Sequence, residues 1–460
     1  MSAPNRMPSA VPGRVFPSSL MPALVAFMVA PAWPAIARGD ETDGGDAAAA
    51  APDETNRLSV GEILRRALDR SPMLAAAGAR VDMARAMPDQ ASAYPVPSFG
   101  VTAMGIPTSA MDPWEIWYTA RQMIPLSSAR SRRADAAWAG VDAERANADA
   151  AVLDLVLEIR LAYVELGRAL AEASVIDEQT RTIHRMARIA DEAYASGSGM
   201  GTQADSLRAR AELPMLDDEQ RMAGAMAESG RAMIGAAAGL EDDEAVLDPA
   251  VIDPDAFQAP TLPSLDDLLA QALERRPEFA SIEAQARQAE STALAAADEV
   301  WPDLMIEAGV QQRIGGDMSP VGFMLGVEAT IPWVSPGSYR GMEAEAEAQA
   351  RMVRSDADAL RLSIESDLRG LLARYDQIVA GIASYRETIG RLHEAERSAH
   401  AAYVSGAGAF DAILGLESRM LEARRSLVRY LYDTHAVRAR IDRVTARPVE
   451  EQILEAEVWP

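Results

Sequence analysis

The sequence predicts a mainly α-helical chain with a small β part, built from two copies of one structural repeat. Three observations support this fold class: two very long helical segments, two alternating hairpin patterns and a recurring motif. The longest segment, 338–405, has no internal proline and carries a regular apolar stripe. The stripe, at alternating spacings of four and three, consists of Ile364, Leu368, Leu371, Tyr375, Ile378, Ile382, Tyr385, Ile389 and Leu392. This spacing predicts a coiled-coil seam on a helix of roughly 100 Å.

Composition, charge and the absence of known motifs argue against several classes of function. The chain has 460 residues, is 5% aromatic and carries a net charge of −25, which argues against nucleic acid as a partner. Because it has no cysteine, disulfides and thiolate metal sites are excluded. His393 and His400 are seven residues apart rather than four, and no phosphate-binding loop or nucleophile elbow is present. We therefore expect no cofactor, no resident metal and no catalytic residues.

The N-terminal segment has the features of an export signal. Arg6 and Arg14 precede an apolar run, 20–30, that is too short to span a bilayer. Ala35 and Ala37 then form an A-x-A cleavage motif. We predict a signal peptide at 1–37 and a disordered, Ala-rich acidic tail at 38–57; the alternative is that the whole segment is a disordered tail.

A constant offset between motifs predicts an internal duplication. Leu64 and Pro72 recur 205 residues later as Leu269 and Pro277, within a longer matching pattern. The predicted first repeat, 58–240, contains a β-hairpin at 98–124, a long helix at 128–196 and a return helix at 203–240. After a linker at 241–263, the second repeat spans 264–447, with a hairpin at 303–331, a long helix at 338–405, a return helix at 409–447 and a C-terminal tail at 448–460.

Both hairpins alternate apolar with polar residues, which predicts strands with one face of each kind. The positions expected to face lipid are Phe99, Val101, Ile116, Tyr118, Leu304, Ile306, Phe323, Leu325 and Val327. Four strands cannot close a barrel, for which about eight are needed. Two chains would supply eight strands and a filled lumen, and three chains would supply twelve strands and an open pore. The alternative is a small sheet that caps a soluble helical body.

In this order and in duplicate, the motifs resemble those of the TolC-type outer-membrane efflux duct family. The resemblance covers about 58–447 and rests on the Ala-Leu-x-x-x-Pro openings, the hairpins that end in Ile-Pro, the segment 162–166 and two glycine-containing turns. It implies a homotrimer with a 12-stranded barrel in the outer membrane of a Gram-negative-type bacterium. It also implies a helical tunnel through the periplasm and a passive duct rather than an enzyme.

The resemblance further implies where partners bind. The two turns would form the periplasmic tip, which in this family meets a periplasmic adaptor (membrane fusion) protein linked to an inner-membrane efflux pump. The residues implied there are Tyr194, Gly197, Gly199, Asp205, Leu207, Tyr403, Gly406, Phe410 and Leu414. Some members carry acidic gate residues just past the second turn. The aligned positions here are Ala412 and Gly415, with Asp411 and Glu417 one or two positions away.

The cargo and two rival function classes stay open at this stage. The segment 104–112, followed by 122–125, is similar to the branch that serves heavy-metal resistance pumps. Heavy-metal cations are therefore one hypothesis for the cargo, beside small drugs and secreted polypeptides. The rival classes are a soluble periplasmic coiled-coil scaffold or adaptor, which needs no lipid-facing strands, and an exported enzyme with helical insertions.

Overall fold

The computed structural model describes residues 59–105, 114–196, 202–240, 249, 252–314, 321–331, 334 and 336–456, all within the unit Glu54–Pro460. The predicted signal peptide (1–37) and tail (38–57) lie outside the described residues. The first repeat comprises α1 (Val60–Arg70), α2 (Pro72–Ser92), β1 (Ser98–Met104), β2 (Trp114–Pro125), α3 (Ala129–Ala195) and α4 (Gln203–Ala238). The second comprises α5 (Leu265–Arg275), α6 (Pro277–Asp298), β3 (Asp303–Ile314), β4 (Val321–Ala329), α7 (Pro336–Val404) and α8 (Phe410–Val444), followed by α9 (Val449–Ala456).

The duplication extends to the way in which the helices begin. The hydroxyl of Ser59 accepts a hydrogen bond from the backbone N–H of Glu62 at 3.2 Å, which caps α1. The hydroxyl of Ser264 caps α5 in the same way, through Asp267 at 3.2 Å. Pro72 and Pro277 each occupy the first turn of the following helix, where no N–H is needed. Corresponding helices of the two repeats therefore start from the same local chemistry.

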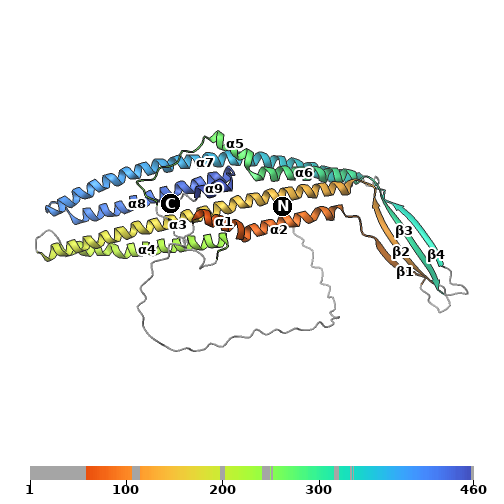
Figure 1. Cartoon of the computed structure of the whole chain (residues 1–460), viewed down its shortest axis with the longest axis horizontal. Coiled ribbons are helices and arrows are strands. Elements are labelled where there is room, and N and C mark those ends of the chain that lie inside the picture. Colours follow the sequence, from red (N-terminus) through yellow and green to blue (C-terminus); the bar gives the residue numbers. More distant parts are fainter. Residues whose placement is uncertain are drawn as a thin grey trace, which may run out of the picture. The chain divides into compact units, whose positions relative to one another are not determined.

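The two longest helices organise the packing. The helix α3 lies against α2 along one part and α4 along another, and α7 lies against α6 and α8 in the same manner (Figure 1). The predicted seam on α7 is buried at Ile364, Leu368, Tyr375, Ile378 and Ile382, in one core with apolar residues of α8. Contacts of α3 with α6 and α8 join the two repeats. The predicted fold class, long duplicated helices with a small β part, is confirmed.

All four strands form one antiparallel sheet in the order β1-β2-β3-β4. The central pair, β2 and β3, joins the two repeats over the full length of both strands, from Trp114 opposite Ile314 to Pro125 opposite Asp303. The sheet continues from the ends of α2, α3, α6 and α7 (Figure 1). The two hairpins of the sequence thus become a single surface.

The predicted C-terminal tail, 448–460, is wrong over most of its length, because residues 449–456 form the helix α9. The return helix also ends earlier than predicted, at Val444, and the chain turns at Ala446, whose φ is +47°. The physical reason is a tertiary contact. The guanidinium of Arg160, which is 1% exposed, donates to Asp442 on α8 and to Gln452 on α9, both at 2.7 Å.

Candidate functional site

The strand register decides which side chains share a face. In an antiparallel pair, directly opposed residues project to the same side. Val101 lies opposite Tyr118, Tyr118 opposite Val310, and Val310 opposite Phe323. Following this register across the sheet, all nine residues predicted to face lipid belong to one face, here called the apolar face. Ile116 and Leu304 are half-buried, and the other seven are exposed, with Phe323 at 86% and Leu325 at 77%.

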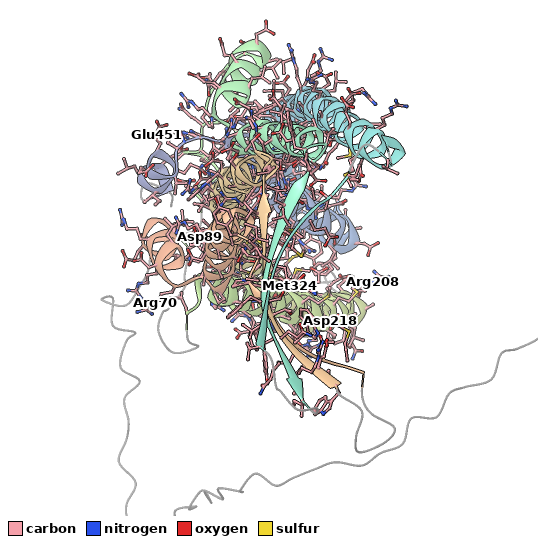
Figure 2. All side chains as sticks on the ribbon, turned by 90° about the vertical axis from the view of Figure 1, so that its right-hand side faces the viewer. Arg70, Asp89, Arg208, Asp218, Met324 and Glu451 are labelled. Atoms are coloured by element: carbon pink, nitrogen blue, oxygen red, sulfur yellow. The ribbon has the colours of Figure 1, made fainter. Side chains whose placement is uncertain are left out.

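The opposite face of the sheet, here called the polar face, carries paired charges. Arg121 on β2 binds Glu307 on β3 at 2.8 Å, and Arg313 on β3 binds Glu115 on β2 at 2.8 Å. Both pairs are directly opposed in the register. Met324 on β4, labelled in the view along the helices from the sheet end (Figure 2), belongs to this face as well. The charged side chains of the strands thus lie on the polar face, which also carries a few apolar ones, and none lies on the apolar face.

Both edges of the sheet are open. In the part of the chain that the structure describes, β1 pairs only with β2, and β4 pairs only with β3. Each edge therefore presents backbone donors and acceptors that a further strand would satisfy. The helices form a row with two open ends in the same way. Helices α2 and α4 pack against α3, α3 packs against α6 and α8, and these two pack against α7. The outermost helices of the row are therefore α2 and α4 at one end and α7 at the other.

At the other end of the helices, two turns close the hairpins. The first turn ends in a capping box, in which the carboxylate of Asp205 accepts from the backbone N–H of Thr202 at 2.9 Å and from its hydroxyl at 2.8 Å. The second turn contains Gly406 with a φ of +75°, a conformation that favours glycine. The rings of Tyr403 and Phe410 then pack across it with centroids 5.6 Å apart.

The predicted tip residues fall into three groups. Tyr194, Leu207 and Gly406 are exposed and free to meet a partner. Gly197 and Gly199 lie outside the described residues. Asp205, Tyr403, Phe410 and Leu414 are buried within the chain. Their burial fits a role in shaping the turns and packing the helices better than a direct contact with a partner.

Two exposed apolar residues near the turns did not stand out in the sequence. Ile189 on α3 and Val404 at the end of α7 are exposed and line a small cavity of about 220 Å³, together with Met186, His400, Tyr403 and Phe410. Val404 directly follows Tyr403 of the turn motif, so the sequence could have indicated that Val404 lies near the turn. Ile189 had no comparable signal, because its exposure depends on how α3 packs against α7 and α8.

The carboxylates near the second turn differ in their surroundings. Asp411 is exposed, whereas Glu417 is buried and accepts a hydrogen bond from the amide of Gln179 on α3 at 3.2 Å. Burial raises the pKa of Glu417, and the neighbouring carboxyl of Glu396 raises it further. Glu417 thus belongs to the packing between helices, and of these two carboxylates Asp411 is the one that faces solvent.

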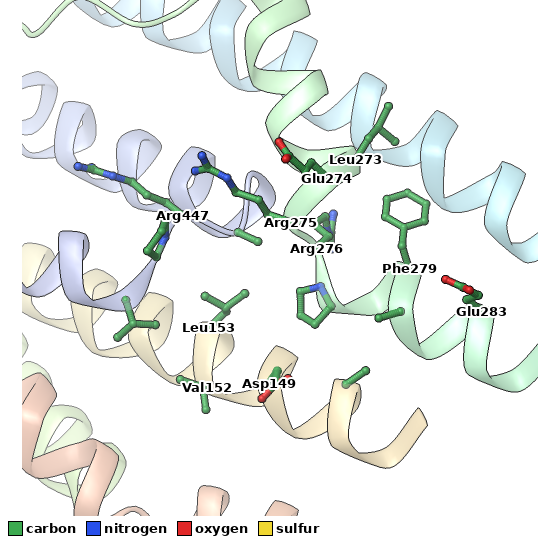
Figure 3. Close-up of a pocket in the computed structure, with 16 residues that line it drawn as sticks. Asp149, Val152, Leu153, Leu273, Glu274, Arg275, Arg276, Phe279, Glu283 and Arg447 are labelled. Carbon is green, nitrogen blue, oxygen red and sulfur yellow. The ribbon is translucent and has the colours of Figure 1, made fainter. Parts of the chain in front are cut away.

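A further cavity, of about 630 Å³, lies where α3, the α5–α6 junction and the segment between α8 and α9 meet (Figure 3). Charged groups beside it compensate one another, since Glu278 accepts from both Arg276 and Arg443 at 2.8 Å. Burial alone would raise the pKa of Glu278, but these two hydrogen bonds outweigh it and lower the pKa to about 2. This cavity is therefore bordered by a structural ion-pair network.

The described residues contain no group of three or more His, Asp or Glu side chains arranged to hold a metal ion. Among their helices, none combines the length and the hydropathy needed to cross a bilayer.

Known outer-membrane proteins match this chain in part of its sequence and in its fold. Residues 63–228 match the family model described as outer membrane efflux protein. The fold is similar to that of CusC, with a TM-score of 0.70 and 15% identity over 84% of this chain and 92% of that one. It is also similar to VceC from Vibrio cholerae, with a TM-score of 0.65 and 19% identity over 84% of this chain and 95% of that one. MtrE from Neisseria gonorrhoeae gives a TM-score of 0.66 and 18% identity over 84% and 88% of the two chains.

No curated protein sequence matches this chain. The family model covers most of the first repeat, and the shared fold extends over both. The predicted resemblance is therefore confirmed for residues 63–228 by the family model, and both repeats share the fold of CusC, VceC and MtrE.

Proposed function

We propose that this chain is the outer-membrane duct of a tripartite efflux system, a passive homotrimer without enzymatic activity. The observation that carries the proposal is the sheet, which has an exposed apolar face, a charged opposite face and two open edges. Pairing β4 of one copy with β1 of the next would satisfy both edges. Three copies then give twelve strands, enough to enclose a pore with lipid outside and water inside.

The helices support the same assembly. The row of helices ends in α2 and α4 on one side and in α7 on the other. Closing the sheet brings the α7 side of one copy to the α2 and α4 side of the next. Exposed methionines on α4, Met215, Met222, Met226 and Met233, suit such a contact because their flexible side chains adapt to a neighbouring helix. The long helices of the three copies would then continue the pore as a helical tunnel.

The partners follow from the same assembly. The exposed residues of the two turns, Tyr194, Leu207 and Gly406, are proposed to contact the periplasmic adaptor, which couples the duct to an inner-membrane pump. Export by a signal peptide cleaved after Ala37 would deliver the chain to the outer membrane. Mass spectrometry of the mature protein is expected to give Arg38 as its first residue, and an intact N-terminus would contradict this part.

The proposed cargo is heavy-metal cations. The motif at 104–112 and 122–125 supports it, as does a net charge of −25, since an acidic duct favours cations. A strain that lacks the gene is expected to become sensitive to metals in a panel of metals and drugs. Sensitivity to drugs alone would reject the cation hypothesis and leave the duct intact.

Membrane insertion of the sheet is tested by a matched pair of arginine variants on β4. Leu325 lies on the apolar face, and its neighbour Met324 lies on the polar face. Leu325→Arg is expected to cost about 2–4 kcal/mol at the bilayer midplane and to prevent assembly in the outer membrane. Met324→Arg is expected to assemble as a trimer and conduct ions in a planar bilayer. Equal assembly of both variants would favour the soluble scaffold instead.

A further inference from the structure

Exposed methionines line one cavity in the half of the helices that adjoins the sheet. This cavity has a volume of about 1100 Å³, and residues of α2, α3, α6 and α7 form its wall. Met83 and Met87 on α2 and Met352 on α7 belong to that wall, with exposed fractions of 65%, 52% and 56%. Methionine often fills gaps in a core, but side chains as exposed as these fill none. We call these three residues the methionine cluster.

The cavity lies on the concave side of the row of helices. Contacts run from α2 to α3, from α3 to α6 and from α6 to α7, so the four helices that line it are consecutive in the row. Four consecutive helices line one cavity where the row curves toward itself. In the proposed trimer the concave side of the closed ring faces the tunnel. Neighbouring copies approach the ends of the row, so the cavity stays open to the lumen.

The donor atoms of the cavity are mostly uncharged. Met83 and Met87 are one helical turn apart, so their thioethers lie on the same face of α2 and can bind one ion. The side-chain amides of Gln90, Gln288 and Gln349 add neutral oxygen atoms to the lining. Thioether sulfur is polarisable and selects soft monovalent ions such as Cu⁺, for which Ag⁺ is the redox-stable analogue. The donor set therefore suits a soft cation.

The charged groups of the cavity do not suit a hard divalent cation. They are one carboxylate, Glu144, and two guanidinium groups, Arg80 and Arg133. Arg133 pairs with Glu299 at the end of α6, which neutralises its charge. Because Mg²⁺ and Ca²⁺ prefer several oxygen ligands, including carboxylates, a single carboxylate beside two guanidinium groups is a poor site for them. The thioethers are the donors that distinguish this cavity.

Resting on the proposed function, which leaves the kind of heavy-metal cation open, we infer that the methionine cluster is a binding site for a soft monovalent cation, Cu⁺ or Ag⁺, on the wall of the tunnel. A site along a conduction path must release its ion as well as bind it. Uncharged thioethers meet this need better than charged thiolates, which hold soft ions more tightly.

The test measures silver binding to the purified full-length protein in detergent and chloride-free buffer. The chain has no cysteine, so no thiol competes for the ion. Isothermal titration gives the stoichiometry and the affinity, and X-ray absorption at the silver edge identifies the ligand atoms. The variant Met83→Leu/Met87→Leu/Met352→Leu removes the three sulfurs at nearly constant volume. The matched control, Met222→Leu/Met226→Leu/Met233→Leu, removes three exposed methionines of α4 that do not line this cavity.

The expected result is one silver ion per chain with sulfur ligands. The cluster variant is expected to lose affinity by at least roughly tenfold, and the control is expected to keep it. Equal affinities in the cluster variant and the unchanged chain would overturn the inference, as would equal losses in both variants. Silver held by oxygen or nitrogen alone in the unchanged chain would overturn it without any variant.

Conductance in a planar bilayer separates this inference from the proposed function. A chain that conducts ions but binds no silver at the methionine cluster would overturn the inference and leave the duct intact. A chain that binds silver there but forms no conducting assembly would reject the duct, and with it the place of the site on a tunnel wall.

Discussion

Two phenylalanines characterise the two ends of the molecule. Phe323 on β4 is 86% exposed, whereas Phe410, the first residue of α8, is 4% exposed and packs against Tyr403. At the turn end the chain provides its own apolar surroundings, through a core that includes Ile176, Ile183, Met186, Ile413 and Leu414. At the sheet end it provides none, and the surroundings must come from outside the chain. The same residue type thus stabilises the fold at one end and, in the proposed function, the membrane contact at the other.

The largest effect is expected from truncating the buried ring. Phe410→Ala leaves a cavity in the core of the turn end and is expected to lower the free energy of unfolding by about 3–5 kcal/mol. Phe323→Ala, the matched variant, leaves no cavity within the protein and is expected to lose clearly less. Guanidinium unfolding followed by circular dichroism in detergent measures both. Equal losses would mean that Phe323 has protein neighbours that the single chain lacks.

The next largest effect on the free energy of unfolding is expected from the backbone conformation of the second turn. At Gly406, with a φ of +75°, an added Cβ would meet no neighbouring atom within 4 Å, so the cost of Gly406→Ala is conformational, about 1–2 kcal/mol. Gly415 on α8 also has no atom within 4 Å of an added Cβ, but it is helical. Gly415→Ala is expected to stabilise the protein by about 0.5–1 kcal/mol. Thermal unfolding of the two variants should therefore shift in opposite directions, and shifts of the same sign would contradict the turn geometry.

A pH-dependent effect is expected at the turn end. Burial and Glu396 raise the pKa of Glu417 above 4.5, so the folded state favours the protonated carboxyl. The contribution of the protonated Glu417 carboxyl to the free energy of unfolding is fully present below pH 4.5. It is lost as the pH rises through the pKa of Glu417 in the folded state. Glu417→Gln is expected to raise the free energy of unfolding at pH 8 by on the order of 1 kcal/mol and to change it little at pH 4.5.

The matched control for Glu417 is Glu422→Gln, an exposed position on the same helix. It is expected to change the free energy of unfolding by less than about 0.5 kcal/mol at both pH values. A gain for Glu417→Gln that is independent of pH would show that the carboxyl charge is not its cause.

The smallest effect is expected on the polar face of the sheet. Arg121 and Glu307 are partly exposed, with 53% and 23% of their side-chain surface accessible. A double-mutant cycle with Arg121→Ala and Glu307→Ala is expected to give an interaction of about 0.2–1 kcal/mol that weakens in salt. An interaction above about 2 kcal/mol would mean that water is excluded from this face and would argue against a water-filled pore.

Much of the fold could be predicted because its signals are local. The prolines that open α2 and α6 and the stripe on α7 each need only a few neighbouring residues to be recognised. The apolar face of the sheet was predictable for the same reason, since side chains alternate along each strand. The helix α9 was missed because a single buried partner, Arg160, gives it its place, and no local pattern shows that partner.

The residues of the second turn show most clearly what the sequence could not predict. The motif around Tyr403 and Phe410 identified the turn, yet its spacing did not show whether these rings point to a partner or to the core. Exposure depends on which helices surround a residue, and here α3 and α8 cover both rings.

The sequence by itself therefore determined the repeat, the long helices, the strands and the two faces of the sheet, because these depend on periodicity and local motifs. Only the tertiary structure decided that β2 pairs with β3 across about 190 residues, that α9 docks on Arg160, and which residues of the turns stay exposed. These features arise from contacts between segments that are distant in the chain. Their free energy comes from burial and pairing in three dimensions, which no local pattern of residues specifies.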